Sequence, residues 1–228
     1  MRTTRITLAA AMLGATAAQA QITDDFNRPN AQTIGSNYTV QNGNFRVNNN
    51  KAETTSFVSL ATYNNSASDY AGVQASLRGF DAGSYVALSF GFDSANSYFV
   101  KVQDNNGDGF FDRYGFDTGN NDLNGIFQPL NSVFQTGSVE VFVQGTTANL
   151  VIVANGGFIQ SYTFDYGFAP GSATVGFGIN RLGVVDDFTF KGLAGAPVPE
   201  PASWGLMIAG FGLAGAAARG RRAKAVAA

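Results

Sequence analysis

The sequence predicts an all-β fold, an antiparallel β-sandwich, with one additional helix at each end of the chain. Composition is the first indication: the 228 residues include 28 Gly, 20 Phe and 8 Tyr, whereas charged residues make up only 13%. Few Leu, Lys or Glu are available between the ends to support long helices. The second indication is periodicity, because short segments alternate between apolar and polar residues and are bounded by Gly, Asn or Asp.

The first element is a secretory signal helix over residues 1–20. Arg2 and Arg5 precede a short apolar stretch, and Ala18-Gln19-Ala20 supplies a small-x-small cleavage site. We therefore expect cleavage after Ala20, export across the inner membrane, and a mature chain that begins at Gln21.

Residues 21–197 are expected to form one domain of roughly a dozen strands. The alternating segments are 70–78, 85–92, 98–102, 139–143, 149–154, 158–164, 175–179 and 184–190. Asn155-Gly156-Gly157 is typical of a hairpin turn. Asp-Asp-Phe occurs in the first strand, at residues 24–26, and in the last, at 186–188. These are either two edge segments that each bury one Phe, or neighbouring strands that close a jelly roll.

Residues 198–228 predict a tail with a membrane-spanning helix at about 202–218. That run contains no charged residue, and at about 1.5 Å per residue it gives roughly 25 Å of helix, at the short end of what spans a bilayer. Trp204 suits the outer interface, and the positive-inside rule places the basic cluster in the cytoplasm. The cluster consists of Arg219, Arg221, Arg222 and Lys224. One interpretation is a permanent anchor.

The second interpretation of the tail is a resemblance. Val198-Pro199-Glu200-Pro201-Ala202-Ser203-Trp204, a Gly-rich apolar helix and a terminal Arg cluster together resemble the PEP-CTERM sorting signal. In that family an exosortase of the membrane recognises the Pro-Glu-Pro box and removes the tail, in Gram-negative bacteria that make exopolysaccharide. The resemblance implies a transient inner-membrane anchor and a mature form at the cell surface or in the matrix. The residues it assigns to processing are Pro199, Glu200, Pro201, Trp204, Arg219, Arg221 and Arg222.

A looser resemblance concerns the domain. Asp24-Asp25-Phe26-Asn27-Arg28, the segment 38–47 and Lys51-Ala52 resemble the opening of concanavalin A-like, laminin-G-like jelly-roll domains of secreted bacterial proteins. The resemblance implies a jelly roll of that type and favours pairing of the first and last strands. Glucanases of this fold carry a Glu-x-Asp-x-x-Glu strand, and neither Glu53 nor Glu140 stands in such a context.

Charge and missing residue types restrict the function. Residues 21–197 contain eight basic and fifteen acidic residues, which gives a formal charge of −7. Nucleic acid is therefore not an expected partner, whereas cations are plausible partners. The chain has no His and no Cys, which excludes Ser-His-Asp and Cys-His nucleophiles and His-ligated zinc. Glycoside hydrolysis needs two carboxyl groups at a fixed separation, and the two glutamates are far apart in sequence. A pair of aspartates could substitute for them, but most of the aspartates occur in turn segments. We therefore expect no catalytic residues.

One segment predicts a calcium loop, Asp104-Asn105-Asn106-Gly107-Asp108-Gly109-Phe110-Phe111-Asp112. Oxygens from positions one, three, five and nine, with the position-seven carbonyl, would ligate Ca²⁺. The ligands would be Asp104, Asn106, Asp108, Phe110 and Asp112. Position twelve is Gly115 instead of Glu, and Asp117 or Asp122 would have to supply the missing oxygen. The alternative is a plain Asn/Asp/Gly hairpin loop.

The function that these features favour is a secreted, non-catalytic surface or extracellular-matrix protein, sorted by an exosortase and contacting exopolysaccharide. Tyr63, Tyr70, Tyr85 and Tyr114 are candidates for sugar stacking, although alternating aromatic residues in strands are usually core. Two alternatives stay open: a glycan-active enzyme of the concanavalin-like fold, and a calcium-dependent self-adhesive protein.

Overall fold

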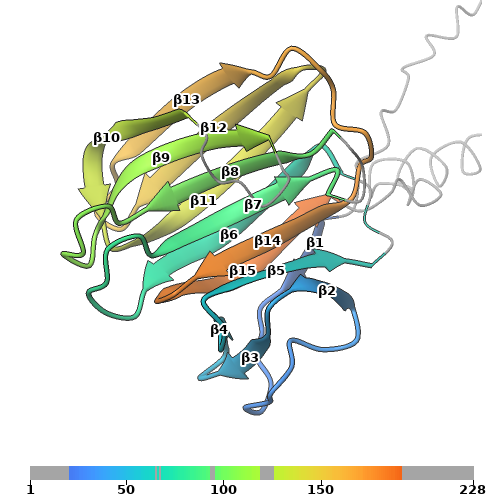
Figure 1. The fold of residues 1–228 in the computed structure, drawn as a ribbon, viewed down its shortest axis with the longest axis vertical. Coiled ribbons are helices and arrows are strands. Elements are labelled where there is room, and N and C mark those ends of the chain that lie inside the picture. The colour runs from blue at the N-terminus through green and yellow to red at the C-terminus, as the bar shows by residue number, and fades with distance from the viewer. Residues whose placement is uncertain (1–20, 65, 67, 93–95, 119–125, 192–228) are drawn as a thin grey trace, which may run out of the picture. The chain divides into compact units, whose positions relative to one another are not determined.

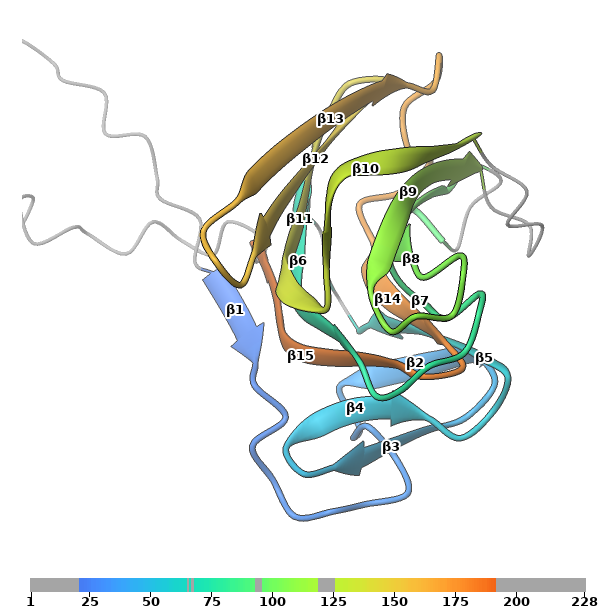
Figure 2. The same cartoon turned by 90° about the vertical axis from the view of Figure 1, so that its left-hand side faces the viewer.

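A computed structural model of the chain describes residues 21–64, 66, 68–92, 96–118 and 126–191, which belong to one compact unit, Ala20–Leu193. These residues form fifteen strands in two antiparallel sheets that pack face to face (Figures 1 and 2). Strands, turns and loops account for all of them, so this part of the chain offers no helix able to cross a membrane. The predicted antiparallel sandwich is confirmed, while both predicted terminal helices lie outside the described residues.

The eight-stranded sheet has the order β13-β12-β11-β6-β15-β4-β3, and β1 pairs with β15 beside this path. Its strands are β1 (Gln21–Asp24), β3 (Phe45–Asn48), β4 (Lys51–Thr54), β6 (Tyr70–Leu77), β11 (Thr136–Gln144), β12 (Thr147–Ala154), β13 (Ile159–Asp165) and β15 (Gly183–Lys191). The hairpin predicted at residues 155–157 joins β12 to β13. Gly156 and Gly157 have φ angles of 123° and 85° there, a conformation that favours glycine.

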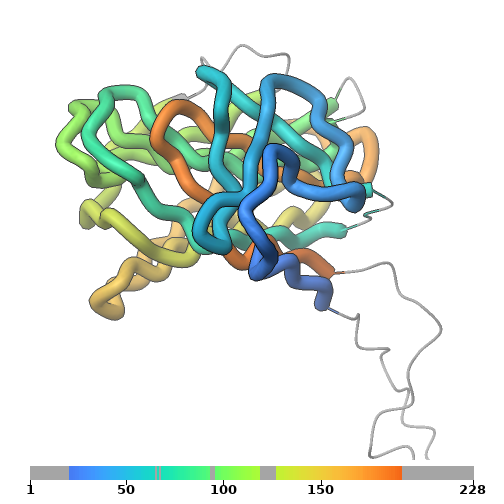
Figure 3. Tube along the Cα trace, turned by 90° about the horizontal axis from the view of Figure 1, so that it is seen from below, coloured from blue at the N-terminus to red at the C-terminus, as the bar shows by residue number. Residues whose placement is uncertain are grey.

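The seven-stranded sheet has the order β10-β9-β8-β7-β14-β5-β2. Its strands are β2 (Tyr38–Asn42), β5 (Val58–Tyr63), β7 (Tyr85–Phe90), β8 (Tyr98–Gln103), β9 (Phe111–Thr118), β10 (Ile126–Phe134) and β14 (Val175–Asn180). Seen from below, the tube in Figure 3 shows the early blue segments beside the late orange ones. Strands from the beginning and from the end of the domain therefore lie beside one another in the sandwich.

The two Asp-Asp-Phe segments are neighbours, as the jelly-roll interpretation predicts. β1 pairs with β15, and Asp24 lies opposite Phe188. Phe26 and Phe188 are both completely buried. Asp24 also fixes the turn that follows, because its carboxylate accepts hydrogen bonds from Arg28 at 2.7 Å and from the Tyr38 hydroxyl at 3.0 Å. The first and last strands of the domain thus lie side by side in the eight-stranded sheet.

The centre of the core is a group of aromatic rings around Phe177. Its ring centroid lies 5.1–5.9 Å from those of Phe26, Tyr38, Phe45 and Phe188. Such pairs add to the burial of apolar area. The tyrosines considered for sugar stacking are mostly covered: Tyr63 and Tyr114 pack against the core, and Tyr85, which does not belong to the core cluster, is only 4% exposed.

Candidate functional site

The outer face of the seven-stranded sheet carries charged side chains between β8 and β9. Along β8 the core takes Tyr98, Val100 and Val102, so the alternation of a strand turns Lys101 and Gln103 to the other face. Asp117 of β9 lies on that outer face as well. Lys101 is only 1% exposed and Asp117 only 5%, although both point away from the core.

Lys101 and Asp117 form a buried ion pair, with 3.7 Å between Nζ and Oδ2. The ammonium group also lies 4.3 Å from the centre of the Phe127 ring and 5.5 Å from that of Tyr85. Burial lowers the pKa of Lys101 to about 8, although the Asp117 charge acts in the opposite direction. Burial and the same carboxylate raise the pKa of Tyr85. A covered ion pair of this kind is a structural feature, because a ligand in solvent does not reach it.

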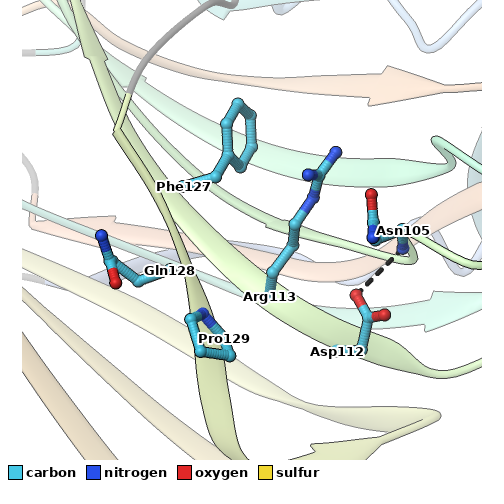
Figure 4. A pocket seen from close by; sticks show the side chains of 6 residues that line it. All are labelled: Asn105, Asp112, Arg113, Phe127, Gln128 and Pro129. Carbon is cyan, nitrogen blue, oxygen red and sulfur yellow. Dashed lines mark hydrogen bonds between the residues drawn. The ribbon is translucent and has the colours of Figure 1, made fainter.

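Phe127, whose ring lies over the Lys101 ammonium group, also lines an open pocket of about 240 Å³ (Figure 4). It is lined by Asn105, Asp112, Arg113, Phe127, Gln128 and Pro129. Figure 4 shows the Arg113 and Phe127 side chains pointing to the same side of the sheet, while Gln128 points the other way. The guanidinium carbon of Arg113 is 4.3 Å from the Phe127 ring centre.

Arg113 is held in place before any ligand arrives. Its Nε donates to Oε1 of Gln103 at 3.2 Å, and the Phe127 ring supports the plane of the guanidinium. On the other wall, Oδ1 of Asp112 accepts the backbone N–H of Asn105 at 2.9 Å. The pocket thus joins fixed donors and acceptors to one apolar ring. That combination suits a small polar ring with hydroxyl groups, and the volume is below the roughly 300–1,000 Å³ of pockets for drug-sized ligands.

The loop predicted to bind calcium, residues 104–112, forms one wall of this pocket. Asp104 is completely buried, and its two carboxylate oxygens accept the backbone N–H groups of Gly107 at 2.6 Å and Gly109 at 2.9 Å. Asp108 accepts the backbone N–H of Phe110, and Asn106 accepts that of Asp108. These are the local side-chain-to-backbone bonds of Asx turns, so the loop closes on its own hydrogen bonds.

Calcium remains a prediction for this loop. The sequence-predicted ligands Asp104, Asn106, Asp108, Phe110 and Asp112 do lie in one loop, and a carboxylate oxygen that accepts one N–H keeps a lone pair for a cation. However, no three acidic side chains of the described residues are grouped closely enough to hold a metal ion. Asp117, considered for the missing oxygen, is paired with Lys101, and Asp122 lies outside the described residues.

The two glutamates of the domain are not a pair. Glu53 on β4 accepts from Arg46 and Arg78, both at 2.7 Å. Glu140 on β11 accepts from the Ser138 hydroxyl at 2.9 Å and contributes, after burial, to raising the pKa of Tyr70 to about 12. β6 and β15 lie between the two strands, which gives three strand spacings, roughly 14 Å. That exceeds the roughly 5–9.5 Å separation of glycosidase carboxyl groups.

Sequence reasoning did not single out Lys101, Arg113 or Phe127. The available signal was a lysine at an outward position of the mostly apolar segment 98–103 and an aspartate at an outward position of the segment 111–118. On an exposed sheet face such charged residues are ordinary. The register of β8 with β9 places Lys101 opposite Gly115 and Asp117 opposite Phe99. Only this register makes Lys101 and Asp117 diagonal neighbours. The predicted processing residues 199–201, 204, 219, 221 and 222, and cleavage residues 18 and 20, lie outside the described residues.

Comparison with known proteins identifies the tail and the fold. Residues 197–222 match the PEP-CTERM protein-sorting motif. No curated protein matches the sequence. Among solved structures, the domain is similar to a lectin from Bauhinia forficata in complex with GalNAc, with a TM-score of 0.54, 11% identity, and coverage of 77% of this chain and 99% of the lectin.

Two further structures share the fold. A seed lectin of Lotus tetragonolobus has a TM-score of 0.52 and 12% identity, with coverage of 76% of this chain and 98% of that one. The Crh5 transglycosylase in complex with NAG has a TM-score of 0.51 and 13% identity, with coverage of 77% and 85%. The chain thus carries a PEP-CTERM protein-sorting motif, and its domain has the concanavalin A-like jelly-roll fold. At these identities the likeness concerns the fold alone.

Proposed function

We propose that this chain is a non-catalytic protein of the cell surface or extracellular matrix of a Gram-negative bacterium, and that it binds exopolysaccharide at the Arg113–Phe127 pocket. An exosortase would cut near Pro199-Glu200-Pro201 and release the domain from its membrane tail. The sorting motif at residues 197–222 supports the route, and the site chemistry supports the ligand.

The observation that carries the glycan proposal is the fixed position of Arg113. Its guanidinium is held by Gln103 and by the Phe127 ring, so binding costs little side-chain entropy. Sugar hydroxyl groups can accept from Arg113 and donate to Asp112, while the apolar part of a sugar ring can contact the Phe127 and Pro129 side chains that line the pocket. The two charges lining the pocket, Asp112 and Arg113, are opposite in sign, which fits a neutral glycan bound weakly.

The spacing of Asp112 and Asp117 supports the proposal that the pocket does not turn over its ligand. Asp112 and Asp117 are five residues apart on β9, which corresponds to roughly 16 Å along a strand. Asp117 is covered and paired with Lys101, and Asp112 holds the Asn105 amide. Asp112 and Asp117 are therefore too far apart to act together as acid and base on a glycosidic bond.

The test is retention of the exported, purified protein on the host's exopolysaccharide, measured together with released reducing ends. We expect retention without release, and loss of retention in Arg113→Ala and Phe127→Ala. Phe57→Ala is the matched control, because Phe57 is 63% exposed and also carries a guanidinium, that of Arg181, at 4.5 Å from its ring. Equal retention by all variants would refute the assignment of the pocket, and sugar release that stops in Asp112→Asn would establish the enzyme instead.

The sorting route has its own test. Intact-mass measurement of the surface-exposed protein from the native host should find neither the residues before Gln21 nor the tail after the Pro-Glu-Pro box. A mass that still includes Arg222 would favour the permanent anchor, and a mass that includes Met1 would contradict signal cleavage.

A further inference from the structure

Asparagine is followed by glycine four times in the sequence, at residues 42–43, 106–107, 124–125 and 155–156. An Asn-Gly pair can lose its side-chain amide without an enzyme, because the backbone nitrogen of the glycine attacks the side-chain carbonyl carbon and the glycine has no Cβ to obstruct the approach. As dipeptides the four pairs are equivalent. Residues 124–125 lie outside the described residues, and the structure separates the other three pairs.

The reaction sets two requirements on the structure. The glycine nitrogen bonds to Cγ of the asparagine, and the side-chain nitrogen leaves as ammonia with the hydrogen of the glycine N–H, so that a cyclic imide forms. Water then adds to one of the two imide carbonyl carbons and breaks its bond to nitrogen, which gives aspartate or isoaspartate. The glycine N–H must therefore be free to lose its proton, and the backbone must be free to bring this nitrogen to Cγ.

The pair Asn155-Gly156 meets both requirements. Both residues are exposed in the turn between β12 and β13. Within the described part of the chain, no hydrogen bond holds the Gly156 N–H or the Asn155 side chain. The space around Gly156 is open as well, because a Cβ built there would lie 4.0 Å from the nearest atom beyond its chain neighbours, Cδ2 of Phe158.

The pair Asn106-Gly107 meets neither requirement. The Gly107 N–H donates to Oδ1 of Asp104 at 2.6 Å, and a carboxylate at that position disfavours loss of the proton. The Asn106 side chain is bound to Asp108 through both of its polar atoms. Its Nδ2 donates to Oδ2 of that aspartate at 3.0 Å, and its Oδ1 accepts the backbone N–H at 3.1 Å. Attack on Cγ would first have to break these hydrogen bonds.

The pair Asn42-Gly43 fails the second requirement. Asn42 is exposed too, so exposure alone does not distinguish the pairs. It belongs to β2, however, and is paired with Leu60 of β5. The Gly43 backbone packs closely on its neighbour, because a Cβ built there would lie 2.1 Å from the Val58 carbonyl oxygen. The strand pairing and this contact fix the peptide between Asn42 and Gly43, so its nitrogen reaches Cγ only after a local opening of β2.

We infer that Asn155 is a site of spontaneous chemical modification, at which the exported protein slowly acquires aspartate and isoaspartate while Asn42 and Asn106 keep their amides. The reaction involves only this chain and water. It therefore goes beyond the proposed glycan binding and does not depend on it.

The products change the surface around the turn. Asn155 and Phe158 line an open pocket of about 350 Å³, and the described residues that line it carry no charge. Loss of the amide adds a carboxylate to that lining. Isoaspartate also adds one carbon to the main chain of the turn that sets the register of β12 with β13.

Peptide mapping by mass spectrometry, after incubation of the purified exported protein at mildly alkaline pH, measures amide loss at each pair separately. In the folded protein we expect Asn155 to react first and Asn106 to lag by at least about tenfold, because the Gly107 N–H must leave a charged acceptor before it reacts. In denaturant the pairs should react at similar rates. An Asn155 that reacts no faster than Asn106 in the folded protein would overturn the inference, and so would a difference that persists in denaturant.

Two variants test the cause of the difference. Asn155→Gln keeps an amide but would have to close a larger ring, so modification at 155 should disappear while Asn42 and Asn106 behave as before. Asp104→Ala removes the acceptor of the Gly107 N–H and should accelerate amide loss at Asn106. The rate at Asn42 is the control for a general loosening of the fold and should not change. In Asp104→Ala, an Asn106 rate that stays the same, or that rises only together with the Asn42 rate, would contradict the protection assigned to the hydrogen bond.

Discussion

Removing the Asp104 carboxylate should destabilise the domain and expose how the 104–112 loop is held. Asp104 is completely buried and accepts the N–H groups of Gly107 and Gly109. A hydrogen bond to a charged acceptor contributes about 1.5–3 kcal/mol, so the two together contribute about 3–6 kcal/mol. Part of this is recovered, because the exposed side of the loop admits water. We expect Asp104→Ala to lower the free energy of unfolding by about 2–4 kcal/mol.

Thermal unfolding followed by circular dichroism measures this loss. For a domain of this size each kcal/mol corresponds to about 2–4 °C, so the midpoint should fall by roughly 5–15 °C. Asp108→Ala is the control, because Asp108 is exposed in the same loop and should change stability by less than about 1 kcal/mol. If Asp104→Ala melts within a degree or two of the wild type, the hydrogen-bonded loop does not stabilise the fold.

The same melts decide whether calcium binds. A ligand that binds only the folded state raises its stability by mass action, about 2.7 kcal/mol at a hundred times the dissociation constant. If Asp104, Asn106, Asp108 and Asp112 hold Ca²⁺, the wild-type midpoint should rise in calcium relative to chelator, and both alanine variants should lose that increment. Identical melts in calcium and chelator would make the loop a turn only.

Two further predictions concern stability. The lowered pKa of Lys101, about 8 against 10.5 for the free side chain, means that the unfolded chain binds one more proton between these values, so Lys101 should contribute roughly 2 kcal/mol more to the free energy of unfolding at pH 10 than at pH 8. Tyrosines whose pKa is raised by burial act in the opposite direction as the pH approaches 10, so the quantity to compare by chemical denaturation is the difference between the wild type and Lys101→Met. That difference should move by this amount in favour of the wild type from pH 8 to pH 10, and a constant difference would contradict the assignment. Gly176→Ala should lower the free energy of unfolding by about 3 kcal/mol or more, because the new Cβ would lie 2.2 Å from the Ala61 carbonyl oxygen. Gly178→Ala on the same strand is the control: its Cβ would lie 3.5 Å from the nearest atom, so the loss should be less than about 1 kcal/mol. Equal denaturation midpoints for the two variants would contradict the packing of β14 on β5.

Much of the domain could be predicted from local patterns. The alternation at residues 70–78 corresponds to β6, where Val73, Ala75 and Leu77 are buried. The hairpin at 155–157 and the strands around it are also found. Strand β10 had no prediction, and its segment contains Pro129 and a register shift, so it shows no regular alternation. An edge strand with a bulge has few constraints on its side chains, and its periodicity is accordingly weak.

The candidate site could be predicted only in part. The Asp104–Asp112 loop is visible because all its bonds are local in sequence. Arg113 and Phe127 could not be linked in advance, because the residues between their strands give no indication that β10 returns beside β9. Their contact depends on the register that places Phe127 opposite Gly115, where the missing side chain leaves space for the ring.

The sequence by itself predicted export, and it determined the PEP-CTERM sorting motif of the tail and the antiparallel sandwich. These conclusions depend on short motifs and on period-two alternation, which act over a few residues. Only the tertiary structure decided that β6 lies between β11 and β15, that Lys101 and Asp117 meet under Phe127, and that β13 is the terminal strand of its sheet. Each of these depends on pairing between strands distant in sequence, and the alternation of a strand fixes which face it buries but not which strand becomes its neighbour.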